Sequence, residues 1–594
     1  MQLTALDWVV IATYFVITIG IGLWFSRKAS ESMADYFVSG RSLPWWLAGT
    51  SMVATTFAAD TPLAVTGMVA KNGLAGNWVW WSLAMGGMVT VFVYAKLWRR
   101  AEVMTDVELT EMRYSGRPAS ALRLIRAVYV ALIINPIIIG WVTGAMLAVL
   151  QGTVLSTPGG ESTSSGMLDW MIIVGCLAVV GVYCTFSGLW GVAFADVLQF
   201  FAAMIGCSLL AYFAVQHVGG MDALHAKVVE SYGSDQAFRF LPDVTAEDAW
   251  LPLHAFLVFL LVQWWATWYP GAEPGGGGYV VQRMAACQDE RHATLATLWY
   301  QVAHYCVRPW PWILVAFVSL AMYPELRERA LDSSLGRADV GFAWVMRDVS
   351  PVGVRGLMLV TFFAAFMSTI STQMNWGASY LTRDVYQRFV NPTATDDQLV
   401  RASRWLSVLV LVTGAAASWI MKDIDIDDVW RIMLALGAGS GAVYMLRWFW
   451  WRINAWSEIS AMLGSLVYFL LVQYLLPDLG SEMQLLCVAG ATILTWLVVT
   501  FITRPDDAAT LTSFYRKVQP AGPGWSAVAK QNTDIHPSDN LGISLLCALA
   551  GSAMIYFTIP AIGSLLFGDF SKFAILLGGA IASGIVLRVL MGRK

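Results

Sequence analysis

The chain has 594 residues, of which 57% are hydrophobic and only 13% are charged. A soluble protein of this length would carry about a quarter charged residues, so the composition excludes an ordinary soluble protein and predicts a polytopic membrane protein. The net charge of −3, without a long basic run, does not indicate a nucleic-acid-binding surface. Seven cysteines are scattered without metal-ligand spacing and are expected to be packing residues.

Apolar runs of about 20 residues recur along the chain and predict about fifteen membrane spans. The first of them lacks a basic leader region, so it is predicted to be a retained helix rather than a signal peptide. The expected spans lie near residues 7–25, 44–70, 77–97, 124–150, 168–187, 192–214, 252–270, 296–321, 353–382, 403–421, 428–446, 456–476, 484–503, 541–566 and 571–590.

Lys and Arg gather in the loops on one side of these spans. Because basic loops stay in the cytoplasm, the pattern predicts a multi-pass protein of the inner (plasma) membrane with its N-terminus outside and its C-terminus in the cytoplasm. Residues 503–540 are rich in Pro, Asp, Ser and Ala and are predicted to form a flexible cytoplasmic linker.

Two of the expected spans are interrupted. Residues 55–62 and 268–278 each place an acid beside a proline inside an apolar segment, and the second stretch adds four glycines. The two segments lie five spans apart, an odd offset, so they cross the membrane in opposite directions. Discontinuous helices at matching places in two inverted halves indicate a secondary transporter with its binding site at the breaks.

Sodium is a hard cation that takes oxygen ligands. Pro62 has no N–H and its ring crowds the carbonyl four residues back, so the sequence predicts that the Ala58 carbonyl is free to bind an ion. A later span carries four hydroxyls in five residues, Ser368, Thr369, Ser371 and Thr372. These hydroxyls are either ion ligands or small packing residues bonded to their own helix, and composition alone leaves both interpretations open.

Several motifs together resemble the sodium/solute symporter family, which includes bacterial proline, galactose and sialic acid symporters. They are Asp35-Tyr36-Phe37 with Gly40-Arg41, Ala58-Ala59-Asp60-Thr61, Gly188-Leu189-Trp190-Gly191-Val192 with Asp196 and Gln199, Val281-Gln282-Arg283, and Met367-Ser368-Thr369-Ile370-Ser371.

The resemblance implies an all-α polytopic protein with a LeuT-type 5+5 inverted-repeat core, one extra N-terminal helix and about four extra C-terminal helices. The implied parts are an N-terminal helix and loop (1–43), a first repeat (44–214), an extracellular loop (215–251), a second repeat (252–446) and C-terminal accessory helices (447–594).

The resemblance also implies sodium as the coupling ion. Carried over residue by residue, a main sodium site would use the carbonyls of Ala58, Thr61 and Ala365 and the hydroxyls of Ser368 and Thr369. A second sodium site, found in some family members, would use Asp196, Ser368, Ser371 and Thr372.

The substrate site is less defined, because Glu273 and the following Pro-Gly-Gly-Gly-Gly replace an Asn-Gln pair of the sugar-transporting members. Trp264, Trp265, Trp268 and Tyr269 share a helical face and form either a wall of the substrate cavity or an interfacial belt. Other candidates are Asp60, Glu273, His304 and Arg308. Asp60 has three open roles, in ion binding, in substrate binding or in pairing with Arg308, and the favoured partner of Arg308 is Glu273.

These features predict sodium-coupled symport of a small polar organic solute by alternating access, and they favour a sugar or sugar derivative over an amino acid or carboxylate. The chain has no nucleotide-binding loop and no catalytic histidine cluster, so neither a primary pump nor an enzyme is expected. The alternative of another class is a sensor on the same fold that binds sodium and solute without transport. No obligate protein partner is implied.

Overall fold

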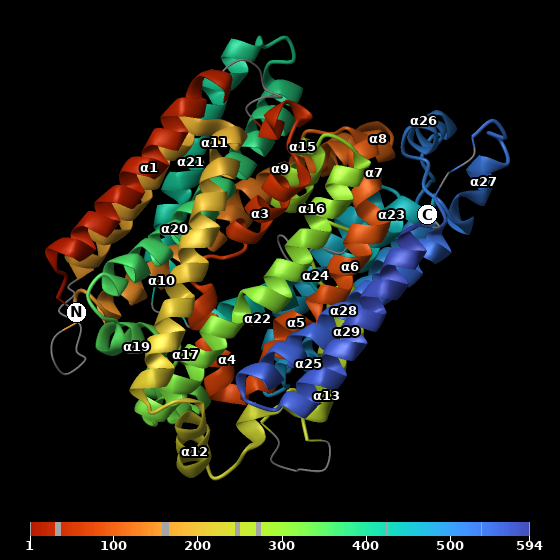
Figure 1. Cartoon of the computed structure of the whole chain (residues 1–594). Coiled ribbons are helices and arrows are strands. Elements are labelled where there is room, and N and C mark those ends of the chain that lie inside the picture. The colour runs from red at the N-terminus through yellow and green to blue at the C-terminus, as the bar shows by residue number, and fades with distance from the viewer. Residues whose placement is uncertain are drawn as a thin grey trace.

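The structure, a computed structural model, describes residues 2–29, 37–156, 166–243, 250–268, 275–422, 424, 426–535, 537 and 539–592. In this part of the chain the regular elements are helices, and most lie side by side in one bundle (Figure 1). Ten helices are long and apolar enough to cross a membrane, and three further apolar helices are shorter. The prediction of an all-α, multi-pass membrane protein is confirmed.

The first half of the core opens with a span broken in two, α3 (Trp45–Thr55) and α4 (Thr61–Asn72). A second span, Leu74–Ala101, combines α5 (Trp78–Trp81), α6 (Leu83–Val89) and α7 (Ala95–Ala101). A short α8 (Leu109–Arg113) precedes a third span, Gly116–Gly152, made of α9 (Gly116–Tyr129) and α10 (Asn135–Gly152).

Residues Gly166–His217 form one uninterrupted run of helix, α11, where the sequence predicted two spans. A straight helix of this length would measure about 78 Å, more than twice the apolar thickness of a bilayer. The neighbours of α11 show that it turns back on itself. Its first half runs antiparallel to α21 (Asp396–Met421), with Trp170 against Trp419 and Gly181 against Leu411.

The second half of α11 runs antiparallel to α20 (Val354–Ser379), because Asp196 bonds Ser368 while Ala202 bonds the earlier Thr361. Since α20 and α21 are themselves antiparallel, with Gly377 beside Val410, the two halves of α11 point in opposite directions. The chain therefore reverses direction within the residues assigned to α11, and the two predicted spans correspond to its two halves.

The second half of the core is also interrupted. Its first span consists of α13 (Leu253–Val258), a π-helical turn and α14 (Trp264–Ala266), and it resumes beyond the undescribed residues 269–274 as α15 (Gly278–Ala286). A long span follows in α16 (Glu290–Val302) and α17 (Pro309–Met322), and then come α20 and α21. The last core span is broken as well, into α22 (Ile426–Leu436) and α23 (Ser440–Phe449).

The break between α22 and α23 was not expected from the sequence. The Trp268 N–H donates to the Gly437 carbonyl at 3.0 Å, and the Gly439 N–H donates to the Ala266 carbonyl at 2.7 Å. A Cβ atom on Gly437 would lie 2.0 Å from the Trp268 oxygen, so only glycine allows this approach. Two interrupted helices therefore satisfy each other's backbone groups in the core, as a membrane interior requires.

The remaining helices surround this core. The N-terminal α1 (Ala5–Ala29) packs on α11 and α20, and the hairpins α24–α25 and α28–α29 cover other faces. Short helices α12, α18 and α19 lie in the connecting loops. The bounds are Ala455–Leu475 for α24, Ser481–Ile502 for α25, Leu541–Leu566 for α28, Phe570–Gly592 for α29, Met221–Tyr232 for α12, Glu325–Leu331 for α18 and Gly341–Val349 for α19.

The segment 503–540, predicted to be a flexible linker, instead contains α26 (Ala508–Val518) and α27 (Ser526–Ala529), which lie at the same end of the bundle as α8 (Figure 1). Phe514 and Trp525 are fully buried and stack with ring centroids 5.4 Å apart. The guanidinium of Arg113 lies 4.8 Å from the Trp525 ring. The prediction missed an apolar face at residues 511, 514, 515 and 518, whose spacing is that of a helix packed on one side.

Replacing Trp525 with Ala tests whether this segment is part of the folded protein. The indole is 1% exposed and its Nε1 donates to the Trp448 carbonyl at 2.7 Å. Removing a buried indole costs about 3–5 kcal/mol, so we expect a clearly lower melting temperature for the detergent-purified protein. Gln531→Ala, at an exposed position of the same segment, is the control. Equal melting temperatures for Trp525→Ala and wild type would contradict the packing described here.

Candidate functional site

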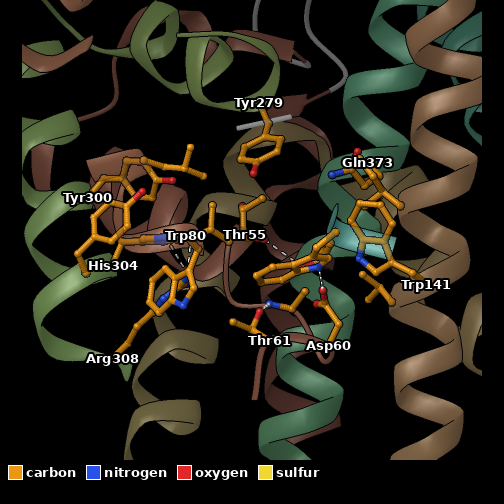
Figure 2. Close-up of a pocket in the computed structure, with 18 of the residues that line it drawn as sticks. Thr55, Asp60, Thr61, Trp80, Trp141, Tyr279, Tyr300, His304, Arg308 and Gln373 are labelled. Atoms are coloured by element: carbon orange, nitrogen blue, oxygen red, sulfur yellow. Dashed lines mark hydrogen bonds between the residues drawn. The ribbon is translucent and has the colours of Figure 1, made fainter. Parts of the chain in front are cut away.

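A cavity of about 100 Å³ lies beside the break between α3 and α4, and Figure 2 shows the side chains around it. Its walls come from both halves of the core. The first half contributes α3, α4, α5, α6 and α10, and the second contributes α15, α16, the π-helical turn before α17, α20 and α22. The lining residues are Thr55, Thr56, Ala58, Asp60, Thr61, Val79, Trp80, Leu83, Ile138, Trp141, Val142, Tyr279, Tyr300, His304, Tyr305, Arg308, Thr369, Gln373, Trp430 and Leu434.

The first break has a different origin from the one argued from the sequence. Helix α3 ends at Thr55, and Pro62 stands in the first turn of α4, where a missing N–H costs nothing. The Ala58 carbonyl is not left free by the proline ring, because it accepts from the Thr61 N–H at 3.2 Å. A carbonyl oxygen has two lone pairs, so one acceptor position on Ala58 remains.

The hydroxyls of α20 reach other helices rather than only their own. Thr369 Oγ1 donates to the Thr55 carbonyl at 3.1 Å, at the edge of the break. Ser368 Oγ donates to Asp196 Oδ1 at 2.6 Å, and Thr372 Oγ1 lies 3.2 Å from Thr55 Oγ1. Ser371 alone bonds back within its helix, to the Ser368 carbonyl. The interpretation of these residues as inert packing hydroxyls therefore applies only to Ser371.

Of the residues in the expected main sodium site, Ala58, Thr61 and Thr369 line the cavity together. Ser368 is the neighbour of Thr369 on α20, and Ala365 is buried one turn earlier on the same helix. The set offers carbonyl and hydroxyl oxygens only, which is the donor chemistry of a hard monovalent cation. These residues fit a sodium ion.

Asp60 is 2% exposed and faces the cavity from the break. Trp430 Nε1 donates to its Oδ2 at 2.9 Å, whereas Oδ1 accepts no hydrogen bond from the described residues. Those residues also include no ion pair between Asp60 and Arg308, and Figure 2 shows the two side chains on different sides of the cavity, with Trp80 between them in that view. Pairing with Arg308, one of the three roles considered for Asp60, is therefore absent in this conformation.

Arg308 follows a π-helical turn of the α16–α17 span, a feature often found at functional sites. Its Nη1 donates to the Val53 carbonyl and to Thr56 Oγ1, both at 3.0 Å. His304 lies between them, with Nδ1 at 3.1 Å from Thr56 Oγ1 and Nε2 at 3.4 Å from Arg308 Nη2. Glu273, the expected partner of Arg308, lies outside the described residues.

The aromatic wall of the cavity is not the one expected. Trp80, Trp141, Trp430 and three tyrosines line it, and Trp80 stacks on Tyr305 with ring centroids 5.6 Å apart. Trp264, Trp265 and Trp268 are absent from the lining. Trp268 instead borders a separate small pocket near Arg126, and Trp265 Nε1 bonds its own helix at the Leu261 carbonyl. Tyr269 lies outside the described residues.

The position of Trp268 outside the cavity lining has a tertiary cause. The chain at Thr267 and Trp268 is extended and bonded to the α22–α23 break, and Trp268 borders the small pocket beside Gly437 rather than the cavity. Trp80 and Trp141, which do line it, sit in ordinary apolar spans, and nothing in their local sequence distinguishes them from other span tryptophans.

The expected second sodium set contains a cation of the protein itself. Asp196 is 1% exposed, and Arg283 Nη2 lies 3.8 Å from its Oδ2. The same nitrogen donates to Thr372 Oγ1 at 2.8 Å. The sequence contains Arg283 within the Val281-Gln282-Arg283 motif, but it does not predict that the guanidinium lies beside the oxygens of Asp196 and Thr372.

The sequence and the fold both resemble those of known proteins. The model of the sodium:solute symporter family matches residues 36–467. A sodium/glucose cotransporter of Vibrio parahaemolyticus is 24% identical over 516 residues, which cover 84% of this chain and 90% of the relative. Sodium/glucose cotransporter 1 of Oryctolagus cuniculus is 25% identical over 501 residues, which cover 79% of this chain and 71% of the relative.

Among solved structures, a Na⁺-coupled sialic acid symporter in a substrate-bound outward-open state matches with a TM-score of 0.66 and 18% identity, over 85% of this chain and 99% of that one. At this identity the likeness shows the fold alone. It confirms the predicted LeuT-type architecture with additional helices. The family match begins at Tyr36, ends within α24 and covers most of the chain. This protein therefore belongs to the sodium:solute symporter family.

Proposed function

We propose that the protein is a sodium-coupled symporter that carries a small polar solute, most suitably a sugar or sugar derivative, by alternating access. One observation carries the proposal: the cavity meets the broken α3–α4 span and the hydroxyl-bearing stretch of α20 at one place, so ion and solute sites adjoin. The protein would then act as a transporter and not as an enzyme.

The main sodium site would consist of Ala58, Thr61, Ala365, Ser368 and Thr369. An ion held there would bridge the break in the first repeat and α20 in the second, since Thr369 already contacts the end of α3. It would thereby stabilise the arrangement that forms the cavity. A ligand shifts the equilibrium between two conformations of a transporter only if it binds one of them better than the other. A site whose ligands come from two segments that move relative to each other meets this requirement.

The solute would occupy the cavity between the aromatic rings and the polar groups. Asp60 Oδ1 and Gln373 Oε1 are buried acceptors without hydrogen-bond partners among the described residues, and Arg308 Nε is a buried donor without one. A sugar ring presents an apolar face to an indole and hydroxyls to such acceptors and donors. The relatives named as sodium/glucose cotransporters support this class.

A zwitterionic amino acid or a carboxylate is the second candidate. Asp60 and Arg308 stand on different sides of the cavity and could each meet an opposite charge of one solute (Figure 2). A sensor that binds sodium and solute without transport is the candidate of another class. Both alternatives use the same cavity, so binding and turnover must be measured separately.

For the orientation we propose an external N-terminus and a cytoplasmic C-terminus in the plasma membrane, with residues 44–214 and 252–446 as the two repeats. The basic residues Arg99, Arg100 and Arg113 lie with α26 at one end of the bundle, and α12 lies at the other (Figure 1). The positive-inside rule assigns the basic end to the cytoplasm.

The substrate class can be established by melting curves of the purified protein with a panel of hexoses, sugar acids and amino acids, in NaCl and in matched KCl. A bound solute stabilises the folded state by mass action, so a true substrate raises the melting temperature, and does so more strongly in sodium. The stabilising solute is then tested for sodium-driven uptake into proteoliposomes. Sodium-dependent binding without uptake would favour the sensor, and stabilisation by amino acids alone would replace the sugar assignment.

Thr369→Val tests the main sodium site, because valine keeps the shape of threonine but removes the hydroxyl. We expect the sodium concentration for half-maximal uptake to rise about tenfold or more. Loss of one ligand oxygen that weakens sodium binding by about 1.4 kcal/mol corresponds to a tenfold loss of affinity. Thr369→Ser keeps the hydroxyl and should remain close to wild type. Ser379→Ala, at the far end of α20, controls for removing a buried hydroxyl. An unchanged sodium requirement in Thr369→Val would place the ion elsewhere.

Comparing Trp141→Leu with Trp264→Leu tests which tryptophans contact the solute: those that line the cavity in the structure, or those singled out in the sequence. Only Trp141 lines the cavity, so we expect the solute concentration for half-maximal stabilisation to rise about tenfold in that variant and to stay unchanged in the other. Melting curves with increasing solute provide the measurement. The opposite order of effects would mean that the solute binds at the second break instead.

A further inference from the structure

A closed polar cluster lies where α3, α11, α15 and α20 meet. Its acid is Asp196, whose Oδ1 accepts from Ser368 at 2.6 Å and whose Oδ2 accepts from Ser51 at 2.5 Å. Both carboxylate oxygens are thus already bonded to hydroxyls that donate to them. The residues expected to hold a second sodium, Asp196, Ser368, Ser371 and Thr372, all belong to this cluster or border it.

Arg283 is fully buried and places its guanidinium among the same oxygens. Its Nε donates to Ser51 Oγ at 3.2 Å, and its Nη2 donates to Thr372 Oγ1 at 2.8 Å and to Thr55 Oγ1 at 3.3 Å. Its Nη1 is held by the Tyr279 carbonyl and by Gln282 Oε1. Every nitrogen of the guanidinium therefore has a partner, and one of the acceptors, Thr372 Oγ1, belongs to the expected second sodium set.

The pattern of unpaired atoms separates this cluster from the cavity. Asp60 Oδ1, Gln373 Oε1 and Arg308 Nε are buried without hydrogen-bond partners among the described residues, as expected where a ligand is missing. Asp196 and Arg283 have no buried polar side-chain atom without a hydrogen-bond partner. The same holds for the four hydroxyl residues around them, Ser51, Thr55, Ser368 and Thr372. Each of these polar atoms already has a hydrogen-bond partner, and the position beside Asp196 that a cation would take is occupied by the guanidinium of Arg283.

Charge leads to the same conclusion. Arg283 and Asp196 form a buried pair with no net charge, and among the residues that the structure describes no second acid pairs with Arg283. A sodium ion at Asp196 would stand within a few ångströms of the guanidinium, and two like charges at such distances repel strongly in a weakly polar interior. The ion would also lose its hydration shell, and one of its expected ligands, Thr372 Oγ1, already accepts a hydrogen bond from Arg283.

We propose that Arg283 is the built-in cation of this cluster, taking the place of a second sodium, so that the chain binds one sodium, at its main site. The inference rests on the proposed function, since it presumes a main sodium site. It also assigns Arg283 a positioning role: the guanidinium ties α15, which follows the second break, to α3 and α20, which border the first.

Counting bound sodium on the purified protein tests this without knowledge of the solute. With radioactive sodium as the probe, we expect one ion per wild-type chain at saturation. Arg283→Ala should gain one further ion, because removing the guanidinium leaves Asp196 as an unpaired buried anion with hydroxyl oxygens around it. Arg283→Ala combined with Asp196→Asn should return to one, since the anion is then gone. Two ions on the wild-type protein would overturn the inference.

Asp196→Asn alone provides a second arm should Arg283→Ala fail to fold. We expect its sodium count to remain at one while its melting temperature falls, and a fall from two ions to one would overturn the inference. Asp339→Asn is the matched control, because Asp339 is a buried acid paired with Arg337 at 2.7 Å outside this cluster.

Failure of the proposed function has a different signature. A wild-type protein that binds no sodium at all would contradict the proposed main site. The role of Arg283 is tested separately, by the difference in the number of bound sodium ions between the wild type and Arg283→Ala. A folded Arg283→Ala protein with the same sodium count as wild type would overturn the assignment of Arg283 as the resident cation.

Discussion

The non-helical backbone of residues 56–60, between α3 and α4, is the constraint on which the site depends. Backbone N–H and C=O groups inside a membrane protein must find partners within the protein or in a polar cavity. Here the partners come from distant helices: Thr369 of α20 bonds the Thr55 carbonyl, and Arg308 beside α17 bonds the Val53 carbonyl. Trp430 of α22 bonds the Asp60 side chain at the same break. The interruption therefore assembles the walls of the cavity.

Two buried arginines show how the same residue serves two purposes. Arg308 is held by a carbonyl, a hydroxyl and the face of Trp312, and within the described part of the chain no acid pairs with it and its Nε has no partner. In the proposed function this nitrogen is available to a solute. Arg283 is enclosed by an acid and several hydroxyls, and all of its nitrogens are bonded.

The accessory helices are joined to the core by buried charges as well as by apolar packing. Glu458 of α24 is fully buried and lies 3.2 Å from Arg126 of α9 and 3.3 Å from Arg447 of α23. Breaking such a pair leaves an uncompensated charge, so α24 cannot detach from the core at low energetic cost. The helices α26 and α27 add Phe514 and Trp525 against Arg113 at the same end. Parts of the chain outside the expected repeats are thus integral to the folded protein.

Local chemistry accounts for what could be predicted from the sequence. The length and apolarity of the spans, the interruption near Pro62 and the hydroxyls of α20 depend on neighbouring residues only, so the membrane class, the four C-terminal helices and the first break were predictable. The reason given for the free carbonyl of Ala58 was wrong in detail, because the proline begins a new helix and does not distort a continuous one.

Other features required the tertiary structure. The aromatic wall of Trp80 and Trp141, the displacement of Trp268 by the α22–α23 break and the placement of Arg283 beside Asp196 each depend on contacts between residues far apart in the chain. Helical periodicity assigns a side chain to a face of its helix, but it does not say which helix that face meets. The sequence by itself determined where the chain crosses the membrane and two of the places where its helices break, near Pro62 and after Trp268. Only the tertiary structure showed the third break, between α22 and α23, and the packing of the broken helices decided which side chains share a cavity.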